Sequence, residues 1–571
     1  MALQKNKIVL IFLCIISTFH SNCIAGWPVQ KAPLSVVKCK PKNNDIREMN
    51  LAQSIAGLAA QALNDGINTE GVWIEGSKNY ETYYARFIHR IAAKENGNFD
   101  VWQLIRRYEK TGIIKGYILY DASKIDNTIN LATVLAGIKK GVLIDIRQEG
   151  KAKDIGLIKL DDARERTISA SLFDSLKNNL SNSLICLLKP SMFNNRDYAI
   201  AHKSMVYYGV DNLLDTILQW VAPLSPVIGW NQGVEFNHIA PCTKYALFNT
   251  ATDWCQNLAM LSVANASSNL PAFKSLNPKT IDFKEQKNYH AFVLSDGDNM
   301  QWTMGNFINN HEYWANDNAS FVPMSFSTCA VNLSQAAPDA YHKLIETQPA
   351  NVSMAEFGGG YYYPDLFASG RHNRDSLLRL FAIYLNHHMK LNGTHVLIFI
   401  CKDVSSEATT KAYQIFSDEL KDVVGMIAIP YSPYNGGHGK VYWIKNKLNI
   451  DIPVMTASYQ LWVDLRNPGS GDPDSVAHWI NLDVKSDNPF KEHFGWTIVH
   501  AWSSFNNPQD STEIQKQHGV EPVVWTKKLI DSSKTKIVSI EELLWRLRMV
   551  HNERQTKNVI SHWDVTPNGQ L

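Results

Sequence analysis

Apolar positions in the first half of the chain recur alternately with the period of a helix and with that of a strand. Residues 49–63 carry apolar side chains at helical spacing, and residues 72–74 form a short apolar run typical of a strand. Alternation of this kind predicts α/β layers with mostly parallel strands, so we expect one or two small α/β accessory domains here. Further helical patterns lie at 83–93, 129–138, 172–180, 198–205 and 213–221, and further strand patterns at 117–120, 142–144, 184–188, 227–228 and 245–248.

The second half contains eight short runs with strand character. Segments that can form helices lie between them, and the clearest is 373–389, where Leu377, Phe381 and Leu385 fall on one face. Eight strands with helical crossovers in about 280 residues match the size of a (β/α)8 barrel. We expect such a TIM-like barrel, and the alternative is an open, doubly wound sheet. The runs lie at 290–294, 321–326, 351–355, 395–400, 424–429, 452–457, 495–499 and 535–538.

The helix expected at 540–550 has a clear start signal. Ser539 and Glu542 have the spacing of a capping box, in which each side chain binds the backbone N–H group of the other residue. Val538 and Leu543 are placed to make the hydrophobic contact that accompanies such a box. We therefore expect the chain to pass directly from the eighth strand into this helix.

A polar stretch at 266–288, with two prolines and several lysines, separates the two halves. Such a composition is typical of a linker between domains. We therefore divide the chain into a signal peptide at 1–25, α/β accessory domains at 26–165 and 166–285, and a barrel domain at 286–571.

The first residues have the pattern of a secretion signal. Lys5 and Lys7 precede a short apolar run at 8–16, and Cys23 and Ala25 are small residues at the positions that precede a cleavage site. The run is too short for a membrane-spanning helix, and no later segment is long and apolar enough for one. We expect an exported protein without a transmembrane segment, in the periplasm or outside the cell.

Charge and cysteine usage exclude several classes of protein. The 571 residues carry 56 basic and 54 acidic side chains without long runs of one sign, so we expect no nucleic-acid surface. No glycine-rich phosphate loop follows a predicted strand, so we expect no nucleotide site. Six cysteines remain beyond the signal, and their spacings match no zinc site. We expect most of them to be small buried residues, with Cys242 and Cys255 as the closest pair for a disulfide.

Polar, carboxylic and aromatic residues recur directly after most of the eight predicted strands. In a barrel, the carboxyl ends of the strands line one mouth, where active sites lie. This recurrence is the main internal argument for a functional site, and it depends on the barrel. The segments that follow the strands are 295–302, 356–365, 402–403, 431–439, 459–462 and 500–502.

The carboxylates at this mouth are candidates for catalysis. Asp296 and Asp298 lie two residues apart in one loop, where an Asx-turn would explain them equally well. Their oxygen donors also suit a hard divalent cation, although no complete Ca²⁺ loop is present. Glycoside hydrolysis needs two carboxyls on either side of the bond. We expect Asp296 or Asp298 to pair with Glu356, and hold Asp403 and Asp365 in reserve.

The aromatic and polar residues nearby are candidates for substrate contacts. Tyr and Trp side chains offer flat apolar faces with one polar group, which suits sugar rings, although such residues also fill cores. A histidine directly after a strand either exchanges protons, binds sugar hydroxyls or is simply buried. The candidate substrate-binding residues are Trp302, Tyr361, Tyr363, Lys402, Tyr459, Gln460, Trp462, His500 and Trp502.

The stretch 356–365 reads Glu-Phe-Gly-Gly-Gly-Tyr-Tyr-Tyr-Pro-Asp, and Gly358 to Pro364 spell Gly-x-Gly-Tyr-x-Tyr-Pro. This pattern resembles the signature of the GxGYxYP family of putative glycoside hydrolases. The stretches 295–299, 456–462 and 541–547 are also similar to that family. The resemblance implies a carbohydrate substrate and α/β N-terminal domains, and we transfer no catalytic assignment from it.

Three functions fit these observations. The first is an exported glycoside hydrolase that uses paired carboxylates. The second is a non-catalytic glycan-binding protein, in which the same residues only bind a sugar. The third is a metal-dependent polysaccharide lyase or deacetylase with a divalent cation at Asp296 and Asp298, and with Tyr361, Lys402 or His500 as the base. Apart from that cation, we expect no cofactor and assign no metal ligand.

Overall fold

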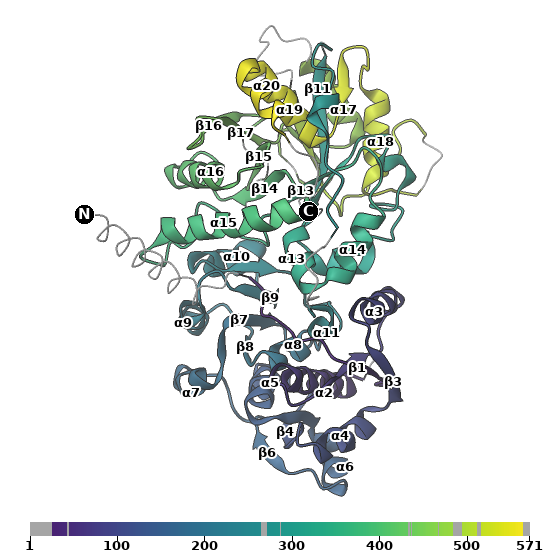
Figure 1. Ribbon diagram of the computed structural model, residues 1–571, viewed down its shortest axis with the longest axis vertical. Helices are drawn as coiled ribbons and strands as arrows, with labels where there is room; N and C mark the ends of the chain where they lie inside the picture. Colours follow the sequence, from purple (N-terminus) through teal and green to yellow (C-terminus); the bar gives the residue numbers. More distant parts are fainter. Residues whose placement is uncertain are drawn as a thin grey trace, which may run out of the picture.

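The structure is a computed structural model that describes residues 26–42, 45–263, 271–285, 287–431, 434, 437–465, 467–483, 494–510 and 515–563. The expected signal peptide at 1–25 lies outside the described residues. Figure 1 shows two halves stacked along the long axis, with the first half in purple and blue and the second in green and yellow. Among the described helices, none is both long and apolar enough to cross a bilayer.

The first half contains three small sheets whose strands are all parallel, as the alternating pattern predicts. The strand orders are β2-β1-β3, β5-β4-β6 and β10-β9-β7-β8. The strands are β1 (Ser35–Cys39), β2 (Glu70–Ile74), β3 (Lys94–Phe99), β4 (Gly116–Tyr120), β5 (Gly141–Asp145), β6 (Lys159–Asp162), β7 (Ser181–Leu188), β8 (Ser204–Tyr207), β9 (Pro226–Trp230) and β10 (Phe248–Thr250).

Helices lie between and around these sheets. Helix α2 is buried at every residue from Asn50 to Leu63 and contacts strands β2 and β5, so it is shared by two sheets. The helix expected at 198–205 is correct only as far as Ala201, because Lys203 has a positive φ that turns the chain into strand β8. The helices are α2 (Ile46–Asn64), α3 (Lys78–Ile91), α4 (Val101–Lys110), α5 (Thr128–Lys139), α6 (Glu149–Asp154), α7 (Ala170–Leu176), α8 (Arg196–Ala201), α9 (Asn212–Trp220), α10 (Glu235–Lys244) and α11 (Leu258–Leu261).

The second half is built on one large curled sheet. Its order is β16-β17-β15-β14-β13-β12-β11-β20-β18-β19, and β21 pairs with β11. All eight predicted strands are present, and β16, β18 and β19 are additional. The strands are β11 (Asn288–Leu294), β12 (Ser325–Thr328), β13 (Ser353–Glu356), β14 (Val396–Cys401), β15 (Gly425–Pro430), β16 (Val441–Lys445), β17 (Asp451–Thr456), β18 (Tyr459–Leu461), β19 (Ser470–Gly471), β20 (Phe494–Val499) and β21 (Thr535–Ile537).

The sheet curls like part of a barrel, and a closed (β/α)8 barrel is not confirmed. Strand β16 runs antiparallel to β17, which no strand of such a barrel does. Strand β21 pairs only with the first three residues of β11, whose last two residues pair with β12. The eight expected strands are thus present, but the sheet contains three more, and closure into an ideal barrel is not confirmed. The sequence pattern marks which segments are strands but does not show how far each pairing extends.

Helices surround this sheet, and α19 packs its apolar residues into the core inside the curl, in contact with strands β11, β13, β17 and β20. The predicted start of α19 is confirmed. The Ser539 side chain accepts a hydrogen bond from the backbone N–H of Glu542 at 3.3 Å. The Glu542 carboxylate binds the Arg546 guanidinium and not the Ser539 N–H, so only half of the expected capping box is formed. The helices are α12 (Met300–Trp302), α13 (Ala330–Ala336), α14 (Pro338–Glu346), α15 (Arg374–Asn392), α16 (Glu407–Glu419), α17 (Pro473–Asp483), α18 (Val520–Leu529), α19 (Ile540–His551) and α20 (Glu553–Ser561).

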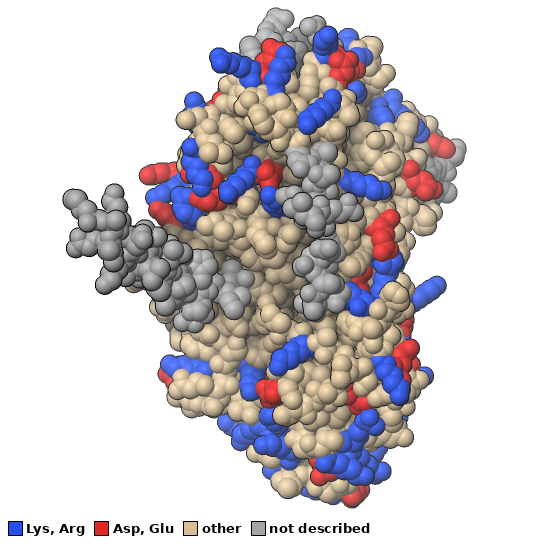
Figure 2. Space-filling view, viewed as in Figure 1, with Lys and Arg blue, Asp and Glu red and all other residues tan. Residues whose placement is uncertain are grey.

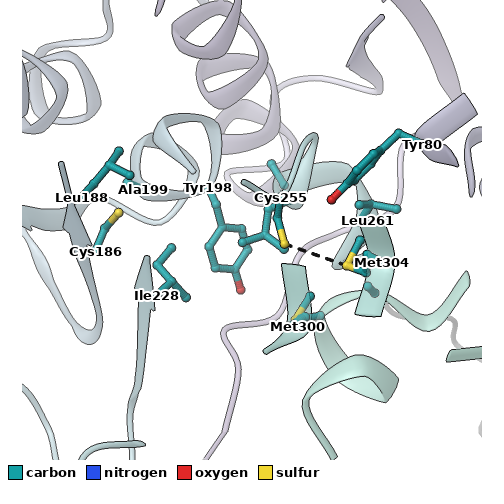
Figure 3. Close-up of a cluster of buried hydrophobic side chains, with 14 of the residues drawn as sticks. Tyr80, Cys186, Leu188, Tyr198, Ala199, Ile228, Cys255, Leu261, Met300 and Met304 are labelled. Carbon is teal, nitrogen blue, oxygen red and sulfur yellow. Dashed lines mark hydrogen bonds between the residues drawn. The ribbon is translucent and has the colours of Figure 1, made fainter. Parts of the chain in front are cut away.

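The two halves share a buried core. Figure 3 shows Cys186 and Tyr198 of the first half in the same cluster as Met300 and Met304, which follow strand β11 of the second half. Cys255 Sγ lies 4.0 Å from Met304 Sδ across this boundary. All six described cysteines are buried and free, so the suggested Cys242–Cys255 disulfide is not formed. This continuous apolar contact fixes the first half relative to the mouth of the curled sheet.

Candidate active site

A cavity of about 330 Å³ lies where the first half contacts the carboxyl ends of the large sheet. Its volume is at the small end of the range for ligand pockets. Three carboxyl groups, several aromatic rings and four isoleucines line it. The lining residues are Trp230, Glu235, Ser295, Asp296, Asp298, Asn299, Phe357, Tyr361, Ile398, Ile400, Ile429, Tyr434, Trp462, Ile498, His500 and Trp502.

The glycine-rich motif joins the two halves beside this cavity. The backbones of Asn249 and Tyr361 form an antiparallel bridge, with N–H to C=O distances of 3.0 and 2.7 Å. Gly360 has φ of +137°, and a Cβ at this position would lie 2.7 Å from the Asn249 carbonyl oxygen. Only glycine therefore permits this close approach. The motif thus holds the edge of the small sheet β10-β9-β7-β8 against the mouth of the large sheet.

The same bridge directs Tyr361 towards Glu235, the first residue of helix α10. The hydroxyls of Tyr361 and Tyr434 both donate to Glu235 Oε1, the latter at 3.2 Å. Burial, and then the negative charge of Asp296, raise the pKa of Glu235 to about 7, whereas the Tyr434 hydrogen bond lowers it. Glu235 is therefore a carboxyl group that holds a proton near neutral pH, which is the requirement for a general acid.

Asp296 and Asp298 follow strand β11 and face the same cavity. Asp296 has φ of +65° and accepts hydrogen bonds from Ser295 Oγ and, at 3.0 Å, from Trp502 Nε1. Both of its oxygens thus have neutral donors, as an ionised carboxylate needs. Burial, and then the charges of Asp296 and Glu235, raise the pKa of Asp298 well above its usual range. The loop therefore presents one carboxylate that accepts from two neutral donors and one carboxyl group whose neutral form is favoured by burial.

Gly297 explains how this loop fits against the sheet. Its N–H donates to Ser327 Oγ at 2.9 Å, and a Cβ at this position would lie 2.1 Å from the Ser327 carbonyl carbon. A larger residue would push the loop away from strand β12. The close approach turns both flanking aspartates into the cavity.

The aromatic residues that line the cavity differ in how far the protein already covers their rings. The rings of Trp462 and His500 are stacked, with centroids 3.7 Å apart and planes at 6°, and Tyr434 packs against Trp462. The Trp462 ring is therefore largely occupied by protein. Trp502 is 44% exposed, and its ring packs on Trp302. Trp502 is thus the wall residue best placed to stack on a sugar ring at the rim.

Glu356 does not line the cavity. It lies on strand β13, where the preceding residue, Ala355, belongs to the core inside the curl, so alternation points Glu356 towards the outer helices. Its two oxygens accept hydrogen bonds from the backbone N–H groups of Gly359 at 3.1 Å and Val331 at 3.2 Å. Burial raises the pKa of Glu356 to about 8. The contacts of Glu356 connect the glycine motif to the start of helix α13.

Six of the predicted residues are brought together at the cavity, and the others are not. The six are Asp296, Asp298, Tyr361, Trp462, His500 and Trp502. Trp302 and Tyr363 are buried in aromatic packing next to it, and the Lys402 ammonium lies over the Phe236 ring. Asp403 accepts from Ser405, Tyr459 binds Asp483, and Gln460 binds Ser470 and the Tyr434 carbonyl oxygen. These contacts lie outside the cavity lining.

Glu235 was missed by the sequence analysis because it lies in the half that we assigned to accessory domains. A weak signal was present: strand β9 ends at Trp230, and a short loop with Gly233 leads to a carboxylate at the first position of a helix. Many helices carry an acidic residue there, because the helix dipole favours negative charge. Nothing in the pattern shows that this helix start faces the mouth of another sheet.

We expect a Glu356→Gln variant to lose stability rather than chemistry. The amide group would place an N–H donor against a backbone N–H, which leaves a buried polar group unsatisfied and costs about 1–3 kcal/mol. Chemical denaturation should show this loss, while kcat of the folded protein should stay within a few-fold of the wild type. A loss of kcat by orders of magnitude in a fully folded variant would instead place Glu356 in the chemistry.

Among the described residues, no group of three or more His, Cys, Asp or Glu side chains is arranged to hold a metal ion. The carboxyl groups of the cavity are thus not arranged as a dedicated metal centre within that part of the chain. The divalent cation considered for Asp296 and Asp298 stays a hypothesis from the sequence.

Three family models match consecutive segments of the chain. Residues 286–529 match the model described as the GxGYxYP putative glycoside hydrolase C-terminal domain. Residues 182–263 match the GxGYxYP third domain, and residues 114–184 match the GxGYxYP_N second domain. The segment that carries Glu235 therefore belongs to a recognised domain of the same family.

One solved structure is similar over nearly the whole chain. It is described as a putative hydrolase from Bacteroides thetaiotaomicron VPI-5482, with 19% sequence identity and a TM-score of 0.75. The similarity covers 92% of this chain and 96% of the other. At this identity the comparison supports the fold alone. No curated protein matches the chain.

Proposed function

The chain belongs to the GxGYxYP family, and we propose that it is a glycoside hydrolase whose catalytic carboxyls come from both halves of the molecule. The observation that carries the proposal is the meeting of Glu235, Asp296 and Asp298 in one cavity that has a protonated and an anionic carboxyl group. Such a pair is what hydrolysis of a glycosidic bond needs.

Each carboxyl group has a role in this proposal. Glu235 donates its proton to the glycosidic oxygen as the bond to the anomeric carbon breaks, and the leaving sugar departs as an alcohol. Asp296 acts on the opposite side, either by attacking the anomeric carbon or by accepting a proton from the attacking water. Asp298, which is protonated, donates a hydrogen bond to a hydroxyl group of the bound sugar. Trp502 supports the ring at the rim.

We also propose that the protein is exported and that its substrate is an oligo- or polysaccharide met outside the cytoplasm. The support is the signal-peptide pattern at 1–25 and the family description of the C-terminal domain. On this proposal the curled sheet serves as a barrel whose mouth is completed by the small sheet β10-β9-β7-β8.

The test is hydrolysis of a panel of aryl glycosides and polysaccharides by the wild type and by Glu235→Gln. Loss of the general acid should lower kcat by roughly 10²- to 10⁴-fold on natural glycosides. The loss should be much smaller on dinitrophenyl glycosides, because their leaving group departs without a proton. Equal losses on both kinds of substrate would contradict the acid role of Glu235. Binding without turnover across the panel would favour the glycan-binding alternative.

The pH dependence offers a second check on Glu235. With a pKa of about 7, the acid loses its proton above neutral pH, so kcat/KM should fall on the alkaline side. The Tyr434 hydroxyl stabilises the ionised form, so Tyr434→Phe should raise the pKa of Glu235 and move this alkaline limb to higher pH. Initial rates across pH measure the limb. A shift to lower pH in Tyr434→Phe would assign the limb to another group.

A further inference from the structure

The hydrogen-bonding groups of the cavity suit ligands with hydroxyl groups, which both donate and accept hydrogen bonds. The hydroxyl groups of Tyr361 and Tyr434 donate hydrogen bonds to Glu235. The Ser295 hydroxyl and the Trp502 indole N–H donate to Asp296. Four donors of the lining thus already serve the carboxyl groups. Carboxyl oxygens accept strongly from sugar hydroxyls, and the protonated forms of Glu235 and Asp298 can also donate to them.

The charge of the cavity favours uncharged ligands over anionic ones. Three carboxyl groups face it, and the described lining includes neither lysine nor arginine. Burial lowers the pKa of His500, so its ring is neutral at neutral pH. An anionic group placed among these residues would face negative charge without a counter-charge, which is strongly unfavourable in a partly buried site. Uronic acids and sulfated sugars are therefore poor ligands for it.

The base of the cavity is apolar. Ile398 and Ile400 of strand β14, Ile429 of β15 and Ile498 of β20 line it and belong to the core inside the curl. These side chains offer no hydrogen bond, so a hydroxyl group held against them would lose its water without gaining a partner. A methyl or methylene group fits this surface without that cost.

Together these features point to one class of sugar. We infer that the cavity takes a single uncharged sugar residue whose hydroxyls donate to the carboxyl wall and whose deoxygenated edge, as in a 6-deoxyhexose, lies against the isoleucine floor. The inference depends on the proposed function only for the choice of sugars as the ligand. The volume of about 330 Å³ suits one terminal sugar residue rather than a long internal segment of a polysaccharide.

The experiment uses trios of glycosides that differ only at the exocyclic carbon, which is a methyl, a hydroxymethyl or a carboxylate group. Several ring configurations are included. Calorimetry with the full-length wild type measures binding of the thioglycosides, in which sulfur replaces the glycosidic oxygen and prevents turnover. Hydrolysis of the matching O-glycosides is measured separately. In the configuration that binds, we expect the carboxylate member to bind at least roughly 100-fold more weakly than the uncharged members.

The floor is tested with a matched pair of variants. The wild type should prefer methyl over hydroxymethyl by about 10-fold or more. Ile400→Thr adds a hydroxyl to the floor and should reduce that preference, whereas Ile400→Val removes a similar volume without a hydroxyl and should keep it. Glu109→Gln, on an exposed face of helix α4, serves as a distant control.

The outcomes separate this inference from the proposed function. A carboxylate member that binds as tightly as its uncharged partners overturns the inference, as does a failure of every uncharged member to bind. Equal effects of Ile400→Thr and Ile400→Val overturn the role of the floor. The expected order of thioglycoside binding without hydrolysis of any O-glycoside overturns the proposed function and leaves the inference standing.

Discussion

An Asp296→Asn variant is expected to lose kcat by roughly 10²- to 10⁴-fold while it keeps its fold. Asn tolerates the left-handed backbone conformation of this position, whose φ is +65°. Its amide oxygen still accepts the hydrogen bond from Trp502 Nε1. The substitution therefore removes the negative charge and little else, and the loss measures what the anionic carboxylate contributes on the side opposite Glu235.

The residual activity of Asp296→Asn should also show a changed pH dependence. The negative charge of Asp296 raises the pKa of Glu235, so its removal lowers that pKa. The alkaline limb should thus move to lower pH, opposite to the shift expected for Tyr434→Phe. Rates across pH on a glycoside whose leaving group needs a proton measure both shifts. Asp474→Asn, at an exposed position in the first turn of helix α17, is the matched control. Wild-type kcat in Asp296→Asn would remove Asp296 from the mechanism.

Replacing Gly360 with Ala is expected to weaken the junction of the two halves. The new Cβ would lie 2.7 Å from the Asn249 carbonyl oxygen, at a backbone conformation that costs about 1–3 kcal/mol for a residue with a side chain. The Asn249–Tyr361 bridge should open, and the Tyr361 hydroxyl should move away from Glu235. A small displacement of a catalytic group lowers rates by up to roughly 100-fold. We expect this loss in kcat/KM together with a lower free energy of unfolding.

Hydrogen exchange distinguishes this mechanism from general damage. In Gly360→Ala the amides of Asn249 and Tyr361 should exchange faster, because each donates to the carbonyl oxygen of the other residue. Gly359→Ala is the control: its φ is +74°, and its new Cβ would meet only side-chain atoms, of which Leu385 Cδ2 is nearest at 3.0 Å. It should lose stability but keep those two amides protected. Unchanged exchange of both amides in Gly360→Ala would contradict the role of the bridge.

The sequence predicted the strands well because their signal is local. Each of the eight runs is a short apolar segment bounded by polar residues, and each became a strand. The antiparallel strand β16 was missed, although its first four residues, Val441 to Ile444, are apolar and typical of a strand. Closure of the sheet could not be predicted, because it depends on pairings between segments that are distant in the chain.

Part of the predicted site meets at the cavity, whereas Glu356 lies outside its lining. Strand β13 consists of Ser353, Met354, Ala355 and Glu356, and all four residues are buried. Burial alone therefore does not show which face of the sheet each residue occupies. Alternation settles the question once Ala355 is known to lie inside the curl. Asp296 and Asp298, in contrast, lie in a loop, where Gly297 turns both towards the mouth.

The charged side chains of the surface are mixed in sign. In Figure 2, Lys and Arg are interspersed with Asp and Glu over the face shown, without a large area of one sign. This arrangement agrees with the near-zero net charge of +2.

The bridge between Asn249 and Tyr361 limits which sequence changes this protein can accept during evolution. Its two hydrogen bonds use backbone atoms, and the Asn249 side-chain amide also donates to the Tyr361 carbonyl oxygen at 3.4 Å. A side chain at position 360 would collide with the Asn249 carbonyl oxygen. In the proposed mechanism one half supplies the acid and the other its anionic partner, so exchange of either half for a foreign module should remove the site. Recombination between relatives should therefore preserve activity only when it keeps both sides of this bridge from the same parent.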